Sequence, residues 1–362
     1  MRFWSRKKKT HQPGKAGVHH HAQGADDEEA DQWANMQSDS LILVMGVTGA
    51  GKSYFINQLK PNSVAEGHGI RSETRACKLV QMQIGACTVA AVDTPGFDDD
   101  DDSDAVVLAK ITHFLITQYR LGIPLKGIIF LHSITTIRFS GSHKRYLDTF
   151  RQICGDDAFK NVALVTTMWH NEKQAIGLRR EAELQTGPWS DLKAKGADVF
   201  QYNGTADMAQ AIVGRLMMKP DVELKIQKEL LKNPSAELNS TTAGAGIASQ
   251  IERKLQATQQ EIQTLTVRIE EAEAARDTLK ARHLRREQDK EREKQLKQMK
   301  SIDALRPKIF EETGERIEEV DSQGRARGQR KSKLQIFVSV LGMITGLTFS
   351  LILPLAGVSI GS

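Results

Sequence analysis

A glycine-rich loop followed by lysine and serine is the first part of the sequence that could do chemistry. Gly46 to Ser53 reads G-V-T-G-A-G-K-S and fits the pattern G-x-x-x-x-G-K-[ST]. It lies between an apolar run, Leu41 to Met45, and a segment of helical pattern, which is the context that this motif requires. Glycines let successive backbone N–H groups point at phosphates, and a following helix start adds a positive field. The loop therefore predicts a nucleoside polyphosphate site.

Each residue of this loop has an expected role. Lys52 is expected to bridge the β and γ phosphates, and Ser53 to offer its hydroxyl to Mg²⁺. The remaining loop residues are expected to cradle the phosphates through their backbone: Gly46, Val47, Thr48, Gly49, Ala50 and Gly51.

A second motif, D-T-P-G from Asp93 to Gly96, follows the apolar run Val89 to Val92. Asp93 is expected to hold Mg²⁺ through water, and the Gly96 N–H to contact the γ-phosphate and respond to its loss. A phosphate sensor also needs a hydroxyl from the segment between the two motifs. Thr74 is predicted to supply it to the metal, with Ser72 as the alternative.

The apolar pattern predicts the elements that hold these residues. Strands and helices are expected to alternate, which indicates a mainly parallel sheet between two helical layers, the α/β three-layer sandwich of P-loop NTPases. Strands are expected at Leu41 to Met45, Lys78 to Ile84, Val89 to Val92, Gly127 to Leu131, Val162 to Val165 and Val199 to Tyr202. Helices are expected at Ser53 to Leu59, Ala105 to Tyr119, Ser142 to Ile153, Asn171 to Leu184 and Thr205 to Met218.

The motifs resemble the septin-like and AIG-type branch of P-loop GTPases, and in particular G-domain-containing proteins of fungi. The resemblance covers about Leu41 to Leu230. It implies GTP and GDP as ligands, Mg²⁺ as cofactor and nucleotide-controlled self-association at membranes or filaments. Besides the two motifs it rests on Ser72-Glu-Thr74, Ile134-Thr135, Arg138, Ser140-Gly-Ser142 and Val165 to Trp169.

The base-reading segment departs from the wider GTPase pattern. Thr166-Thr-Met-Trp169 stands where most members carry N/T-K-x-D, so the aspartate that reads guanine is missing. Base contacts are then expected from backbone groups and Thr167, from stacking on Trp169, or from Glu172. Gly204 is expected in the last base-contacting loop, although Thr205 beside it also fits a plain helix cap.

The residue after Gly96 is Phe97, where many signalling GTPases place the glutamine that orients the attacking water. A phenyl ring cannot accept that hydrogen bond, so intrinsic GTP hydrolysis is expected to be slow, with a second subunit or partner supplying the missing group. The alternative is a non-hydrolysing scaffold that works through its helical region. An ATP-dependent kinase is disfavoured because no acceptor site is apparent.

The domain prediction continues beyond the G domain, which is placed at residues 39–235. A linker is predicted at 236–246 and a coiled coil at 247–301, with a lone amphipathic helix docked on the G domain as the alternative. Arg276 interrupts the predicted seam, and the helix after Lys280 is expected to be solvated. The seam residues are Ile251, Leu255, Thr258, Ile262, Leu265, Ile269, Ala272 and Leu279.

The carboxy-terminal segment predicts a membrane anchor. A polar and basic stretch at 302–333 precedes an anchor at 334–356, and Leu334 to Leu353 would span about 30 Å as a helix. The basic residues on the amino-terminal side place the G domain in the cytosol. The alternative is a buried helical hairpin broken at Pro354. Gly342 and Gly346 form a G-x-x-x-G pair that could let two helices touch.

The rest of the composition is ordinary for a soluble protein. The chain has 362 residues and a net charge of +5. Residues 1–38 are predicted to form a disordered charged tail, and the alternatives for its basic start are contact with acidic lipids or nucleic acid, or a mitochondrial presequence. Three cysteines without metal spacing indicate a reducing compartment. A homo-oligomer through the G domain or coiled coil is expected, and no nucleic-acid partner.

Overall fold

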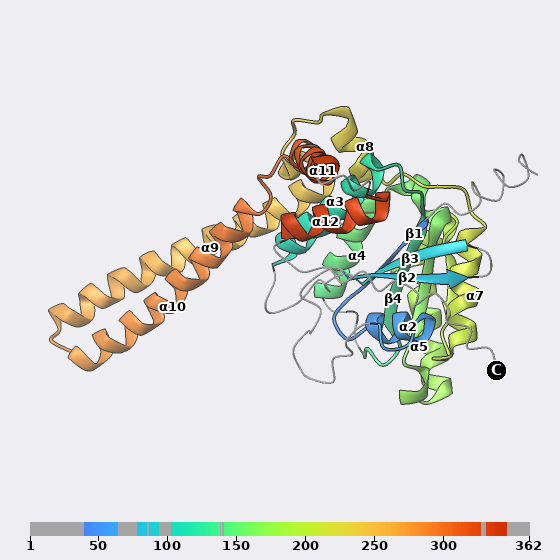
Figure 1. The fold of residues 1–362 in the computed structure, drawn as a ribbon. Helices are drawn as coiled ribbons and strands as arrows, with labels where there is room; N and C mark the ends of the chain where they lie inside the picture. Colours follow the sequence, from blue (N-terminus) through green and yellow to red (C-terminus); the bar gives the residue numbers. More distant parts are fainter. Residues whose placement is uncertain are drawn as a thin grey trace, which may run out of the picture. The chain divides into compact units, whose positions relative to one another are not determined.

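The described residues form a six-stranded sheet with the order β2-β3-β1-β4-β5-β6. The structure is a computed structural model that describes residues 40–63, 78–84, 87–93, 103–137, 139, 141–326 and 331–345. Neighbouring strands run parallel, except that β2 pairs antiparallel with β3 (Figure 1). The predicted strands are confirmed. Their bounds are β1 Ser40–Gly46, β2 Lys78–Ile84, β3 Cys87–Asp93, β4 Leu125–Ser133, β5 Val162–Thr167 and β6 Asp198–Gln201.

Helices connect the parallel strands, because a parallel pair needs a crossover. The predicted α/β architecture is confirmed, and helix α3 lies where a helix was expected after the second motif. The helices of this part are α2 Lys52–Leu59, α3 Asp104–Arg120, α4 Gly141–Cys154, α5 Gln174–Thr186, α6 Ser190–Ala194, α7 Ala206–Met217 and α8 Lys225–Lys232. Short 3-10 turns are η1 Asp156–Asn161, η2 Trp169–Asn171 and η3 Leu238–Ser240.

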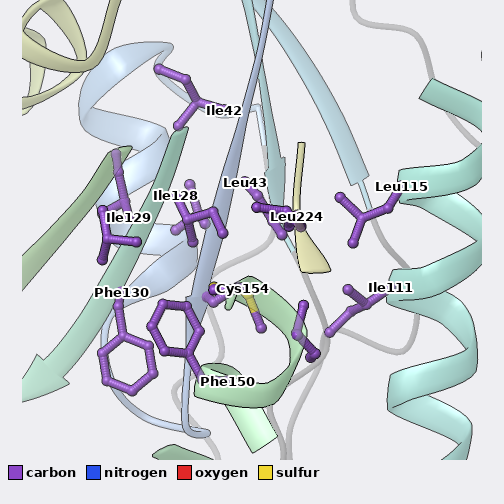
Figure 2. Close-up of a cluster of buried hydrophobic side chains, with 14 of the residues drawn as sticks. Ile42, Leu43, Ile111, Leu115, Ile128, Ile129, Phe130, Phe150, Cys154 and Leu224 are labelled. Carbon is purple, nitrogen blue, oxygen red and sulfur yellow. The ribbon is translucent and has the colours of Figure 1, made fainter. Parts of the chain in front are cut away.

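The core lies between the sheet and its helices. All residues of β1 are buried, which explains its unbroken apolar sequence, since a central parallel strand is covered on both faces. Figure 2 shows side chains of β1 and β4 gathered beside those of α3 and α4. The labelled residues are Ile42, Leu43, Ile111, Leu115, Ile128, Ile129, Phe130, Phe150, Cys154 and Leu224.

Two long helices follow, α9 Thr242–Ala274 and α10 Thr278–Asp303, and they lie side by side (Figure 1). Two hydrogen bonds join them: Gln288 Nε2 donates to Thr266 Oγ1 at 2.7 Å, and Gln298 Nε2 donates to Thr258 Oγ1 at 3.2 Å. The chain thus folds back on itself, so residues 247–301, predicted as one coiled-coil segment, form two helices instead of one continuous helix. The α9 seam of the predicted coiled coil packs within the chain, and its buried cluster with α10 consists of Leu265, Ile269, Ala272, Ala281 and Leu284.

The reversal has a reason in the sequence. Steps of four and three from Ala272 would place Arg276, Leu279 and His283 on the same seam. Two of these three are polar, so a continuous helix would bury charge. Instead Arg276 adopts a left-handed conformation with φ 56°, and Asp277 caps α10 by accepting from the Lys280 N–H at 3.0 Å. Leu279, predicted on the seam, is consequently 80% exposed.

Two further helices pack against α3: α11 Ile309–Ala326 and α12 Lys333–Thr345. The buried face of α12 consists of Leu334, Ile336, Phe337, Val340 and Leu341. Among the described residues, no helix combines the length and apolar character needed to cross a membrane. The first part of the predicted anchor is α12, which packs against α3 and α11. Residues 346–356 of that anchor lie outside the described residues.

Candidate nucleotide-binding site

The loop between β1 and α2 has a backbone that requires glycine. Gly49 and Gly51 have φ of 79° and 88°, which side chains disfavour. At Gly46, with φ 155°, an added Cβ would lie 2.6 Å from the carbonyl oxygen of Leu131 in β4. The three glycines of the predicted loop thus let it curl tightly against the sheet.

Lys52 begins α2 and turns back into the loop. Its side chain is buried, and Nζ donates to the carbonyl oxygens of Gly46 at 3.0 Å and Val47 at 3.2 Å. Phosphate oxygens would be stronger acceptors for this ammonium group, because they carry charge. Ser53 follows in the first turn of α2, where a hydroxyl can reach a metal bound to the phosphates. Thr48 is exposed, whereas Ala50 is buried.

The end of β3 lies at the same edge of the sheet as this loop. Asp93 is in register with Val44 of β1, two residues before Gly46. Parallel strands end together at one edge, so the backbone of the predicted metal-side acid is placed beside the loop. Thr74, Gly96 and the alternative Ser72 lie outside the described residues, and their predicted roles stay predictions.

Thr167, at the end of β5, is tied to the phosphate-binding loop. Its hydroxyl donates to the carbonyl oxygen of Ala50 at 2.9 Å, and the side chain is buried. Met168 follows in a left-handed conformation with φ 60°. Its methyl group covers the loop, since a Cβ at Gly51 would lie 3.3 Å from Met168 Cε. Thr167, expected among the base contacts, thus braces the loop, and its predicted base contact stays a prediction.

Trp169 is partly buried and packs against the core. Its Nε1 donates to the backbone oxygen of Thr166 at 3.1 Å and to that residue's hydroxyl at 3.0 Å. The ring lies on α5, where a Cβ at Gly177 would come within 2.8 Å of Trp169 Cζ3. This packing uses the indole N–H and a side of the ring, so it gives no support to the expected stacking on the base.

Glu172, the other expected base contact, is paired within the protein. Its Oε2 lies 2.6 Å from Arg180 NH1, and its Oε1 accepts from the Lys173 N–H at 3.0 Å. The backbone N–H of Lys173 and the Arg180 guanidinium lower the pKa of this carboxyl. Glu172 is therefore committed to contacts other than a base.

The last predicted contact, Gly204, lies in the turn between β6 and α7. Gly204 has φ 87°, and its carbonyl oxygen accepts from the Tyr54 hydroxyl at 3.1 Å. Thr205 also caps α7, accepting from the Met208 N–H at 3.3 Å, as the alternative interpretation expected. Tyr54 connects the phosphate-loop helix to this turn. Sequence reasoning missed it, although an aromatic residue directly after the metal-side Ser53 could have drawn attention.

Comparison with known proteins gives a family match that includes the loop between β1 and α2. The family model described as 50S ribosome-binding GTPase matches residues 41–131, from the first strand to the end region of β4. Residues 41–131 form part of a P-loop GTPase G domain.

The chain also resembles GTP-binding protein A of Dictyostelium discoideum, with 26% identity over 132 residues, or 36% of this chain. The match spans only 28% of that protein's length. Among solved structures, Toc33 of Arabidopsis thaliana in complex with Mg²⁺ and GMPPNP is 15% identical, with a TM-score of 0.43, and the match covers 56% of this chain and 95% of Toc33. Era of Aquifex aeolicus bound to GDP·AlF4⁻ is 15% identical with a TM-score of 0.37, covering 52% of this chain and 59% of Era.

Proposed function

We propose that this protein binds GTP and GDP with Mg²⁺ and hydrolyses GTP slowly, as a switch for assembly or recruitment. The observation that carries the proposal is the geometry of Lys52, whose ammonium group donates to the Gly46 and Val47 carbonyls within a loop that needs glycine at three positions. Such a loop offers backbone N–H groups and one lysine to a polyphosphate.

Two residues suit the metal part of the proposal. Ser53 in the first turn of α2 supplies the hydroxyl oxygen, and Asp93 at the end of β3 supplies a carboxylate that acts through water. Mg²⁺ prefers hard oxygen ligands and would neutralise charge between the β and γ phosphates. The family match over residues 41–131 and the name of the Dictyostelium relative agree with GTP as the nucleotide.

Slow hydrolysis follows from Phe97, which takes the place after Gly96 where a water-orienting glutamine would stand. A second copy of the G domain or a partner would then complete the site, since an added donor or cation can raise phosphoryl transfer by several orders of magnitude. A homo-oligomer is therefore part of the proposal.

Membrane attachment by the carboxy-terminal segment is proposed from sequence. The segment Leu334 to Leu353 carries no charge, and basic residues precede it, which suits a tail anchor with the G domain in the cytosol. Because α12 is docked on α3 in the structure, attachment would require this helix to leave its place.

Calorimetry with GDP and a non-hydrolysable GTP analogue in the presence of Mg²⁺ tests the nucleotide part. The intact protein should take up both nucleotides. Lys52→Ala should weaken their binding by at least about 100-fold, because it removes a charge-assisted contact. Lys193→Ala, which removes an exposed lysine on α6, should bind like the unmodified protein. Absence of any uptake by the folded protein would refute the proposal.

A further inference from the structure

The contacts around Thr167 establish which residues correspond to the base-reading pattern N/T-K-x-D. That pattern combines a short polar side chain, a long aliphatic stem one residue later and a carboxylate two residues after that. The Thr167 hydroxyl bonds the loop at Ala50, and Met168 lays its methyl group over Gly51. Thr166 makes neither contact, because its hydroxyl donates to the buried carboxylate of Glu181 at 2.9 Å.

This geometry assigns Thr167 to the first position and Met168 to the second. The fourth position is then His170, whereas the sequence pattern alone predicted Trp169 there. His170 lies in the middle of η2, a tight turn in which the Asn171 N–H donates to the Met168 carbonyl at 3.1 Å. It is exposed, and its side chain makes no hydrogen bond or ion pair with another described residue.

The neighbours of His170 are excluded from the role by their own contacts. Trp169 gives its N–H to Thr166 and lies on Gly177, and the Glu172 carboxylate is paired with Arg180. Asn171 is directed to Met168, with Nδ2 3.9 Å from its sulfur. Among residues 169–172, His170 has the one polar side chain that forms no hydrogen bond or ion pair with another residue in the described part of the chain.

We infer that His170 is the specificity-determining residue that faces the base, and that it reads guanine weakly. This inference rests on the proposed nucleotide binding. A carboxylate can accept both N–H groups of the guanine edge, whereas a neutral imidazole offers a single acceptor nitrogen. A hydrogen bond to a neutral acceptor also contributes less than one to a charged acceptor. The ratio of the ADP to the GDP dissociation constant should therefore be smaller for this protein than for a variant with a carboxylate at this position.

The substitution His170→Asp tests the assignment by a gain of selectivity. Dissociation constants for GDP, ADP and inosine diphosphate should be measured by calorimetry on the full chain with Mg²⁺. We expect the unmodified protein to prefer GDP over ADP by no more than about tenfold, and His170→Asp to raise that preference by a further 10- to 100-fold. Inosine diphosphate, which lacks the exocyclic amino group, should bind the variant about tenfold more weakly than GDP.

Asn171→Asp is the matched control, because it adds the same charge one residue away on the same exposed turn. Its ratio of ADP to GDP dissociation constants should stay within about threefold of the unmodified value. The inference is overturned if His170→Asp leaves that ratio unchanged, or if Asn171→Asp raises it equally. Failure to bind any of the three nucleotides would instead refute the proposed function, so the two failures are distinguishable.

Discussion

The ring of Phe337 in α12 meets the ring of Phe114 in α3 edge-on, with centroids 5.0 Å apart and an interplanar angle of 85°. This pairing is a favourable arrangement of aromatic rings, and Phe337 is completely buried. It joins the first part of the uncharged carboxy-terminal segment to the helix that follows the second nucleotide motif. The docked state of α12 is thus held by specific side-chain packing.

Replacing Phe337 by alanine should release α12. The change removes a fully buried ring and should lower the free energy needed to detach α12 from α3 by about 3–5 kcal/mol. Hydrogen exchange of the α12 and α11 amides should accelerate as a result. Met343→Ala on the same helix, at a side chain 42% exposed, should change exchange little. Equal protection of α12 in the Phe337 variant and the unmodified protein would contradict the docking.

Acidification should destabilise the fold through His113 on α3. Burial lowers the pKa of His113 to about 4 from an ordinary value of 6.5. The folded state therefore favours the neutral ring. The resulting contribution of His113 to the free energy of unfolding is complete above pH 6.5 and is lost as the pH falls toward 4. It amounts to about 3 kcal/mol.

Urea unfolding between pH 7 and pH 4.5 checks this contribution. His113→Leu removes the titrating group, so its unfolding free energy should fall less steeply with decreasing pH than that of the unmodified protein. A residual slope is expected from His132, since burial and then His143 lower its pKa to about 4. His283→Leu, at an exposed site on α10, should keep the original slope. An unchanged slope in His113→Leu would refute the assignment.

Tyr54→Phe should weaken nucleotide binding without unfolding the G domain. The change removes the hydroxyl that bonds the Gly204 carbonyl and keeps the ring, so the turn after β6 loses its connection to the phosphate-loop helix. A hydrogen bond of this kind contributes about 1 kcal/mol, or roughly fivefold in the dissociation constant. Calorimetry with GDP measures it, and Tyr119→Phe on α3 is the control. Unaltered affinity in Tyr54→Phe would show that this connection has no part in binding.

Arg276→Gly should stabilise the turn between α9 and α10. Arg276 has φ 56°, and a residue with a side chain pays about 1–2 kcal/mol for the left-handed conformation that glycine adopts freely. The free energy of unfolding should therefore rise by about 1 kcal/mol, as measured by urea titration followed by circular dichroism. In contrast, Arg282→Gly inside α10 should lower it by about 1 kcal/mol. A loss of stability in Arg276→Gly would mean that the turn is not formed this way.

The G domain was largely predictable because its signals are local. The run before Gly46 and the loop itself specify strand, turn and helix within a short stretch, and alternating apolar segments give the remaining order. Contacts between distant residues could not be read in the same way. Tyr54 and Gly204 are 150 positions apart, and Thr167 and Ala50 are 117 apart.

For two further features the sequence fits more than one arrangement, and packing selects one. Thr166 and Thr167 have identical side chains, and we infer the register of the base-reading segment from the hydrogen bond of Thr167 to Ala50. Along α9, steps of four and three reach Arg276, where a continuous helix would bury a charge. The chain instead reverses there, with Arg276 in a left-handed conformation. Neither choice follows from local propensity.

The two ends of the helical hairpin meet where it leaves the rest of the fold. The Leu238 N–H donates to the Pro307 carbonyl at 3.1 Å and the Asn239 N–H to the Leu305 carbonyl at 2.8 Å, so entry and exit are fastened to each other. Beyond Ile251, the last α9 residue of the main core cluster, the arms mostly contact one another. We therefore expect the length of the outer hairpin to be variable. Whole helical turns could be added to or removed from both arms without changing the attachment point.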